Sequence, residues 1–164
     1  MVAVGPLVLR SIQFLWTLII MALIGNVIAD AFAGNPSAVN YAMFVAAFSM
    51  LVVLYGLAAV FIESLAMPLV LLVLDSLAIL FTFIAGVVLA AKLHVHSCSN
   101  RSYLIHNSLT NGSFNMESRC RELQASTAFF WFLFATYAAS LFFDFVGSRG
   151  SGLRSRSSGI TRGL

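Results

Sequence analysis

The side chains best suited to chemistry in this sequence include one acid inside a long apolar stretch. Between Arg10 and Lys92 the only charged residues are Asp30, Glu63 and Asp75, and Asp75 has apolar neighbours on both sides. A buried carboxylate needs hydrogen-bond donors or a positive charge. No Lys or Arg falls within a predicted apolar segment, so we expect neutral donors, for which the candidates are Ser76, Thr82, Gln13, Thr17 and Asn26.

A second group of reactive side chains lies in the longest polar stretch. His94, His96 and Cys98 alternate, so on extended backbone they would share a face, where zinc would need His106 or Cys120 as a further ligand. A disulfide between Cys98 and Cys120, with solvated histidines, explains the same residues without a metal. Closing a loop of this size contributes about 3 kcal/mol in an oxidising compartment, and we therefore predict the disulfide and no metal site.

The composition determines the solvent in which these residues work. The chain has 164 residues, of which 60% are hydrophobic and 9% are charged, and its mean hydropathy is +0.97. Soluble domains have about 25% charged residues. The sequence is therefore that of an integral membrane protein. Its solvent-facing segments contain no nucleophile motif, phosphate-binding loop or paired carboxylates, so we expect no enzyme, no cofactor and no nucleic-acid partner.

A membrane crossing needs a helix of roughly 20 apolar residues, since the bilayer offers the backbone no hydrogen-bond partners. Four segments meet this condition, and they predict an all-α bundle of four transmembrane helices within residues 1–146: 11–29, 41–62, 65–91 and 128–146. Asp144 falls near the end of the last segment, as an interface residue. The first segment is longer than the apolar part of a typical cleaved signal, so we expect it to be retained.

The connection 92–127 has the features of an extracytoplasmic loop. It contains both cysteines and two glycosylation acceptor patterns, Asn100-Arg101-Ser102 and Asn111-Gly112-Ser113. This orientation places both termini in the cytoplasm. The tail 147–164 is rich in Gly, Ser and Arg and has no acid, so we expect a disordered segment that attracts anionic inner-leaflet lipids. Its arginines are Arg149, Arg154, Arg156 and Arg162.

Small residues at four-residue spacing predict where the helices meet, because helices in lipid associate by close backbone approach. The third segment carries Ala78, Thr82, Gly86 and Ala90, and the first carries Gly25 and Ala29. Internal packing accounts for such faces, and self-association into a homo-oligomer is the alternative. The last segment has more aromatic residues than one packing face can use, which predicts lipid or subunit contacts. They include Phe129, Phe130, Trp131, Phe132 and Phe134.

The run Arg-Cys-Arg-Glu-Leu-Gln-Ala-Ser-Thr-Ala-Phe-Phe-Trp, which begins at Arg119, leads from the second cysteine into the aromatic start of the last segment. This run resembles the fungal non-classical export protein family, whose members carry a MARVEL domain of four spans with cytoplasmic termini. The resemblance covers about Leu7 to Val146, and its most specific part is Cys120 to Trp131.

This resemblance implies a plasma-membrane organiser associated with the furrow domains called eisosomes. The implied roles are eisosome assembly, a response to sphingolipid state and unconventional protein export. The implied partners are other eisosome proteins, and bound sterol or sphingolipid. Composition alone indicates a small membrane bundle. The alternative function is a small proton-linked transporter or channel that uses Asp75 as its intramembrane acid.

Overall fold

The computed structural model describes residues 4–32, 34–94 and 96–158; the side chains at 144 and 146–158 are not described. The elements follow the order α1 (Val4–Ala29), α2 (Ser37–Phe61), the short 3-10 helix η1 (Glu63–Leu65), α3 (Pro68–Leu93), α4 (Arg101–His106) and α5 (Met116–Ser158). Within these residues four helices are long and apolar enough to cross a membrane: α1, α2, α3 and the part Met116–Phe143 of α5. The predicted all-α fold with four membrane-spanning helices is confirmed.

Local sequence explains where the helices begin and end. Pro68 occupies the first turn of α3, where its missing N–H leaves no hydrogen bond unmade. The same helix ends at His94, which adopts a left-handed backbone conformation with φ 48°. The side chain of Asn100 caps α4 by accepting from the Tyr103 amide, and that of Asn115 accepts from Ser118 in the first turn of α5.

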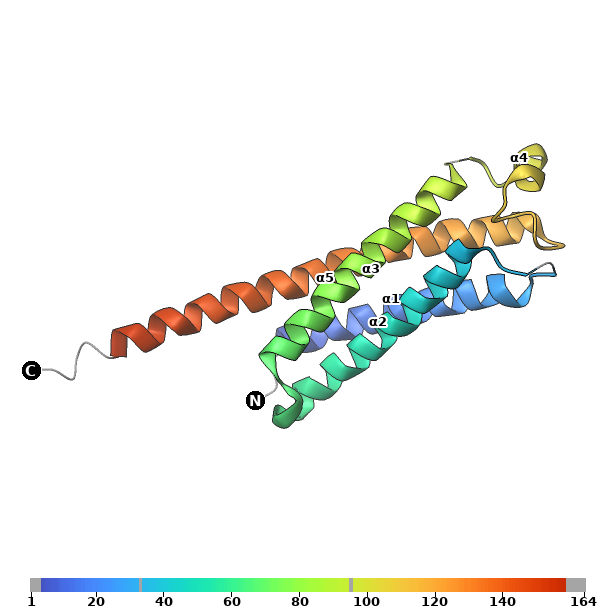
Figure 1. Cartoon of the computed structure of the whole chain (residues 1–164). Coiled ribbons are helices and arrows are strands. Elements are labelled where there is room, and N and C mark those ends of the chain that lie inside the picture. The colour runs from blue at the N-terminus through green and yellow to red at the C-terminus, as the bar shows by residue number, and fades with distance from the viewer. Residues whose placement is uncertain (1–3, 33, 95, 159–164) are drawn as a thin grey trace, which may run out of the picture.

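The four long helices form a ring in which α1 packs on α2, α2 on α3, α3 on α5, and α5 on α1. Helices α1 and α3 face each other across the bundle, as do α2 and α5. Figure 1 shows that the α1–α2 turn and the segment containing α4 lie at the same end of the molecule. These two connections are joined directly, since the Phe32 amide donates to the Gly112 carbonyl at 3.1 Å.

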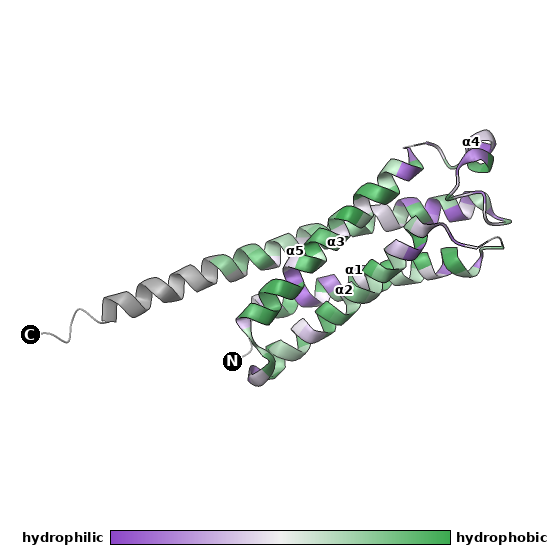
Figure 2. Cartoon of the chain, in the orientation of Figure 1, coloured by the Kyte–Doolittle hydropathy of each residue, from purple (hydrophilic) through white to green (hydrophobic). Residues whose placement is uncertain are grey.

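Hydrophobic residues cover the outside of the bundle as well as its core. Ile20, Val39, Val45 and Leu89 are among the fully buried residues, while many large apolar side chains, such as Leu51 at 68% exposed, point outward. Figure 2 shows hydrophilic residues mainly at the end that carries α4, and the long helices as largely hydrophobic. A helix that is hydrophobic all round suits lipid on its outer side.

The helix bounds correct the predicted segments in three places. Helix α1 begins at Val4, so Arg10 lies within it and does not precede it. Helix α5 begins at Met116, well before the predicted start at 128, because charged residues at the watery end of a helix interrupt the apolar run without interrupting the helix. The connection between α3 and α5 is correspondingly shorter than 92–127, and it contains α4.

Helix α5 also continues to Ser158, whereas the composition predicts disorder from residue 147 onward. Extending an existing helix costs much less than starting one, and Arg and Leu are good helix formers. The side chains of Asp144, Arg149, Arg154 and Arg156, and all of Arg162, lie outside the described residues.

Candidate functional site

A buried ion pair joins α1 to α3 across the centre of the bundle. The guanidinium of Arg10 donates to both carboxylate oxygens of Asp75, from Nη1 to Oδ1 at 2.8 Å and from Nη2 to Oδ2 at 2.5 Å. Asp75 is fully buried and Arg10 is 6% exposed. Two parallel hydrogen bonds between opposite charges form the strongest class of side-chain contact. The predicted intramembrane acid is therefore neutralised by an arginine from the facing helix.

The remaining two helices complete the surroundings of this pair. Gly56 of α2 leaves room for the arginine side chain, because a Cβ atom at that position would lie 2.5 Å from Arg10 Nε. Arg10 Nη1 also donates to Gln13 Oε1 at 3.0 Å, and Gln13 Nε2 in turn donates to Ser140 Oγ of α5 at 2.9 Å. One network of side chains thus contacts all four membrane-spanning helices.

A second polar contact spans the other diagonal of the bundle. The hydroxyl of Tyr137 on α5 donates to the carbonyl oxygen of Ser49 on α2 at 3.1 Å, and both residues are fully buried. Tyr137 lies within electrostatic range of both Arg10 and Asp75. Since lipid supplies no hydrophobic drive for helix association, polar contacts of this kind specify which helices face each other.

The neutral donors expected for Asp75 make other contacts. Thr82 and Thr17 donate to carbonyl oxygens one turn earlier in their own helices, and Ser76 does the same on the exposed side of α3. Asn26 donates to Glu122. The prediction of a neutral partner was wrong because the predicted first span begins after Arg10, which excluded this residue as a partner. A long arginine side chain can nevertheless extend well beyond its own helical turn and bring its charge to a buried acid.

A spacing in α1 does indicate the buried position of Arg10. The buried residues of this helix recur every three or four positions, in the order Arg10, Gln13, Thr17, Ile20, Ile24 and Val27. The polar residues at the start of this list therefore continue the same inward face as the apolar residues that follow. A charged residue in register with a buried stripe is a better indicator of burial than its position relative to an apolar run.

A second buried arginine holds the opposite end of the molecule together. Arg119 of α5 is 2% exposed. It donates from Nε to the Leu109 carbonyl at 2.7 Å, from Nη1 to the Val27 carbonyl at 2.6 Å and from Nη2 to Asn35 Oδ1 at 3.3 Å. These acceptors come from the loop before α5, from the end of α1 and from the turn before α2. No local sequence pattern indicates this role.

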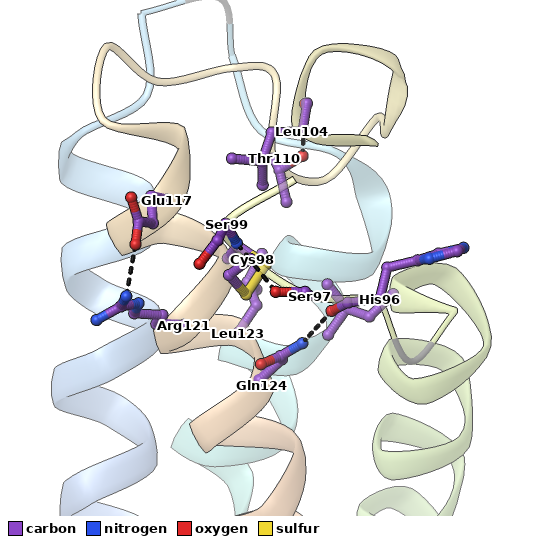
Figure 3. The surroundings of a disulfide bond; sticks show 12 residues. His96, Ser97, Cys98, Ser99, Leu104, Thr110, Glu117, Arg121, Leu123 and Gln124 are labelled. Atoms are coloured by element: carbon purple, nitrogen blue, oxygen red, sulfur yellow. Dashed lines mark hydrogen bonds and ion pairs between the residues drawn. A yellow bond between two sulfur atoms is a disulfide. The ribbon is translucent and has the colours of Figure 1, made fainter. Parts of the chain in front are cut away.

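The predicted disulfide between Cys98 and Cys120 is confirmed, with the two Cα atoms 5.7 Å apart. Leu104 of α4 packs on it, and Gln124 Nε2 donates to the His96 carbonyl beside it at 2.9 Å (Figure 3). The two sulfur atoms bind each other, which leaves neither thiolate for zinc. Among the described residues, no group of three or more His, Cys, Asp or Glu side chains is arranged to hold a metal ion.

The predicted small-residue faces differ in what they meet. Ala78, Thr82 and Gly86 are buried, and a Cβ atom at Gly86 would lie 3.2 Å from the Trp131 ring of α5. On α1, by contrast, a Cβ atom at Gly25 would meet nothing within 4 Å, and Ala29 is exposed. Spacing identifies both faces, and only α3 uses its face for contact within this chain. Ala90 is half-buried at the end of the α3 face.

The aromatic residues of α5 fall into three environments. Phe130 is fully buried, so it packs the core and cannot be the lipid or subunit contact that the sequence predicts. Phe129 and Phe132 pack against Trp16 of α1, with ring centres 5.4 and 5.7 Å away. Trp131 and Phe134 pack against Phe83 of α3, at 5.8 and 5.6 Å. Phe132 at 52% exposed and Phe83 at 44% exposed remain open to the outside.

Comparison with known proteins places this bundle among related chains. The membrane-associating domain MARVEL matches residues 2–143. Non-classical export protein 2 of Saccharomyces cerevisiae is 44% identical over 140 residues, covering 85% of this chain and 79% of that protein. Non-classical export protein 102 of Candida albicans is 38% identical over 159 residues, covering 96% and 92%. A Schizosaccharomyces pombe homologue of the first is 30% identical over 135 residues, covering 81% and 72%. No solved structure matches the chain.

Proposed function

Since the chain belongs to the MARVEL membrane-associating family and is related to yeast proteins named for non-classical export, we propose that it organises the plasma membrane laterally. In this proposal it supports the assembly of eisosome furrows and adjusts that assembly to sphingolipid state. A role in unconventional protein export follows from this organisation. The proposal includes no catalytic reaction.

The observation that carries the proposal is the contrast between the interior and the exterior of the bundle. The interior is fixed by the Arg10–Asp75 pair and by the Tyr137–Ser49 contact. The exterior presents large apolar and aromatic side chains from every long helix, Phe83 and Phe132 among them. A rigid bundle with an aromatic outer surface is suited to contact sterols, sphingolipids or further copies of itself.

The orientation belongs to the proposal as well. A cytoplasmic start of α1 places the disulfide and α4 outside the cell, and it places the basic end of the chain next to the anionic inner leaflet. That arrangement gives the tail arginines an attractive partner. It also leaves the other eisosome proteins to bind from the cytoplasmic side.

The test is clustering of the purified, fluorescently labelled protein in giant vesicles that contain phosphatidylcholine, sterol and sphingolipid. We expect wild-type patches, and even spreading of the double variant Phe83→Leu, Phe132→Leu, which removes two exposed rings and keeps the apolar surface. The matched control is Phe114→Leu, since Phe114 is 91% exposed and precedes α5. Patches of equal size in the double variant and the control would contradict the proposal.

The alternative, a proton-linked transporter that uses Asp75, is disfavoured by the same ion pair. Protonating Asp75 would leave a buried guanidinium without its carboxylate, and such a charge is costly in the bundle interior. Liposomes under a pH gradient test it directly. A proton or solute flux through the wild-type protein that Asp75→Asn abolishes would favour the transporter over the organiser.

A further inference from the structure

A pocket of about 380 Å³ lies where α3 leaves the membrane, between the end of that helix and α4. It gathers every histidine of the chain together with one lysine and three further polar side chains. The six residues that matter for its chemistry are Lys92, His94, His96, Tyr103, His106 and Asn107. They are separated by up to 15 positions in the sequence, so the fold and not a local motif brings them together.

Hydrogen bonds fix the framework of this pocket. Asn107 Nδ2 donates to the Lys92 carbonyl at 2.8 Å and to the Tyr103 hydroxyl at 3.1 Å. That hydroxyl donates in turn to the Leu93 carbonyl at 2.5 Å, and the His96 and Tyr103 rings lie 4.7 Å apart. The end of α3 and helix α4 are therefore held at a set distance, and the side chains of Lys92 and of the three histidines are exposed.

The electrostatics of the pocket favour an anion. Its lining residues contribute one lysine, three histidines and one tyrosine as titratable groups, and none of them is a carboxylate. Burial raises the pKa of the Tyr103 hydroxyl, so that group stays neutral and adds no negative charge. Helix α5 approaches this segment through Gln124, which is uncharged and bonds the His96 carbonyl; Figure 3 shows the His96 side chain pointing away from the disulfide.

We propose that this pocket binds the phosphate of an anionic lipid headgroup from the leaflet on its own side of the membrane, and that its three histidines make this binding tighter in mildly acidic surroundings. Lys92 supplies an ammonium group, and Asn107 and Ser108 supply neutral polar groups. Histidine is the side chain whose charge changes between about pH 5 and pH 8. Each added positive charge near a membrane surface strengthens such binding about fivefold.

A lipid, and not a dissolved anion, is the ligand that the position favours. Ala91 and Lys92 line the pocket and also form the last turn of α3, one of the four helices long and apolar enough to span the bilayer. A lipid that stands beside this helix therefore brings its headgroup to the pocket opening at high local concentration. The inference rests on the proposed function for its membrane setting, and it adds a phosphate-bearing lipid headgroup to the sterols and sphingolipids named there.

The test measures lipid retention by single copies of the protein, so it does not depend on clustering. Nanodiscs of phosphatidylcholine with a minor fraction of phosphatidylglycerol are equilibrated at about pH 5.5 and about pH 7.5. The protein is then extracted in mild detergent, and the two retained lipids are counted by mass spectrometry. We expect the ratio of phosphatidylglycerol to phosphatidylcholine to rise by up to about 100-fold at the lower pH, because three added charges at about fivefold each multiply.

Variants assign the effect to named side chains. The triple variant His94→Gln, His96→Gln, His106→Gln should lose the pH dependence, and Lys92→Gln should retain about fivefold less phosphatidylglycerol at both pH values. Arg121→Gln is the matched control, because it removes one positive charge from an exposed residue of α5 that pairs with Glu117; its lipid ratio should equal that of the wild type.

Three results would overturn the inference. These are a wild-type ratio that does not change with pH, a triple variant that keeps the wild-type change, and displacement of phosphatidylglycerol by millimolar inorganic phosphate, which would make a free anion the ligand. If the triple variant does not fold, His106→Gln alone should reduce the pH effect, since His106 is exposed. A protein that clusters normally without retaining anionic lipid would refute this inference and leave the proposed function standing.

Discussion

Removing one charge of the Arg10–Asp75 pair should destabilise the bundle far more than removing both. Asp75→Asn leaves a buried guanidinium without its carboxylate, and Arg10→Met leaves a buried carboxylate without its guanidinium. Breaking a buried pair in this way costs about 3 to 5 kcal/mol, and an uncompensated charge within a membrane helix costs about 2.5 to 3.5 kcal/mol. We therefore expect each single variant to lose about 3 kcal/mol of unfolding free energy.

The double variant Arg10→Met, Asp75→Asn should lose at most about 1 kcal/mol, because neutral side chains that fill a similar volume often replace a buried pair without loss. The network offers a partner for the amide introduced by Asp75→Asn. In the wild type Gln13 Oε1 accepts from Arg10, and Arg10→Met leaves this oxygen free to accept from the amide. The coupling between the two sites, obtained from the four proteins of the cycle, should then be about 5 kcal/mol.

The two single variants should also differ in their response to pH. In Arg10→Met the isolated carboxyl can take up a proton and become neutral, so this variant should recover stability as the pH falls. In Asp75→Asn the arginine cannot lose its charge at any accessible pH, so that variant should not recover. The stability of the double variant should not depend on this site at any pH.

The assay is unfolding in mild detergent by added dodecyl sulfate, followed by tryptophan fluorescence with the disulfide intact. Both tryptophans report helix contacts, since Trp16 packs on Phe129 and Trp131 packs on Phe83. The reasoning would be refuted if the two single variants and the double variant all had unfolding free energies within about 1 kcal/mol of the wild type. Equal pH responses of the two single variants would refute it as well.

Three further predictions concern the contacts around this network. Gly56→Ala should destabilise the bundle by about 1 to 3 kcal/mol, because the new Cβ atom would lie 2.5 Å from the Arg10 guanidinium. Gly25→Ala is the control, since a Cβ atom there would meet no other atom within 4 Å, and it should gain up to about 1 kcal/mol in the same unfolding assay. Arg119→Met should cost about 3 kcal/mol, since it leaves two buried carbonyl oxygens without a donor; hydrogen exchange should then rise in the loop before α5, and unchanged exchange there would contradict its role. Cys98→Ser should lower stability by about 3 kcal/mol, and adding a reductant to the wild type should produce the same loss, while the variant itself should not respond to the reductant.

The sequence was sufficient to predict the membrane-spanning helices because hydropathy is a property of each segment by itself. The disulfide was predictable for a related reason, since Cys98 and Cys120 are the only cysteines. Helix ends were less predictable. The predicted first span begins after Arg10, and Glu117 falls in the predicted loop, whereas the helical backbone continues through both residues and only the surroundings of their side chains change.

The network at the centre of the bundle depends on contacts between helices, which spacing in one helix cannot specify. Asp75 was recognisable as a residue that needs a partner, yet three different helices supply the groups around it. The small residue at Gly56 gives no sign in the sequence that it makes room for an arginine. Gly25 and Gly86 show the same limit, because both have the expected spacing and only Gly86 lies against a neighbouring helix.

The two buried arginines divide the tasks of the molecule in a way that experiments can separate. Arg10 fixes the facing helices within the bilayer, and Arg119 joins the connections at the end that carries α4. Because lipid gives no hydrophobic drive for helix packing, losing either contact should change the outer surface and the clustering together with the stability. Substitutions at Lys92 or His106 touch neither network, so they should change lipid preference at constant stability. A protein that senses lipids at its surface must show this separation, whereas a protein that senses them by loosening its bundle must lose both properties together.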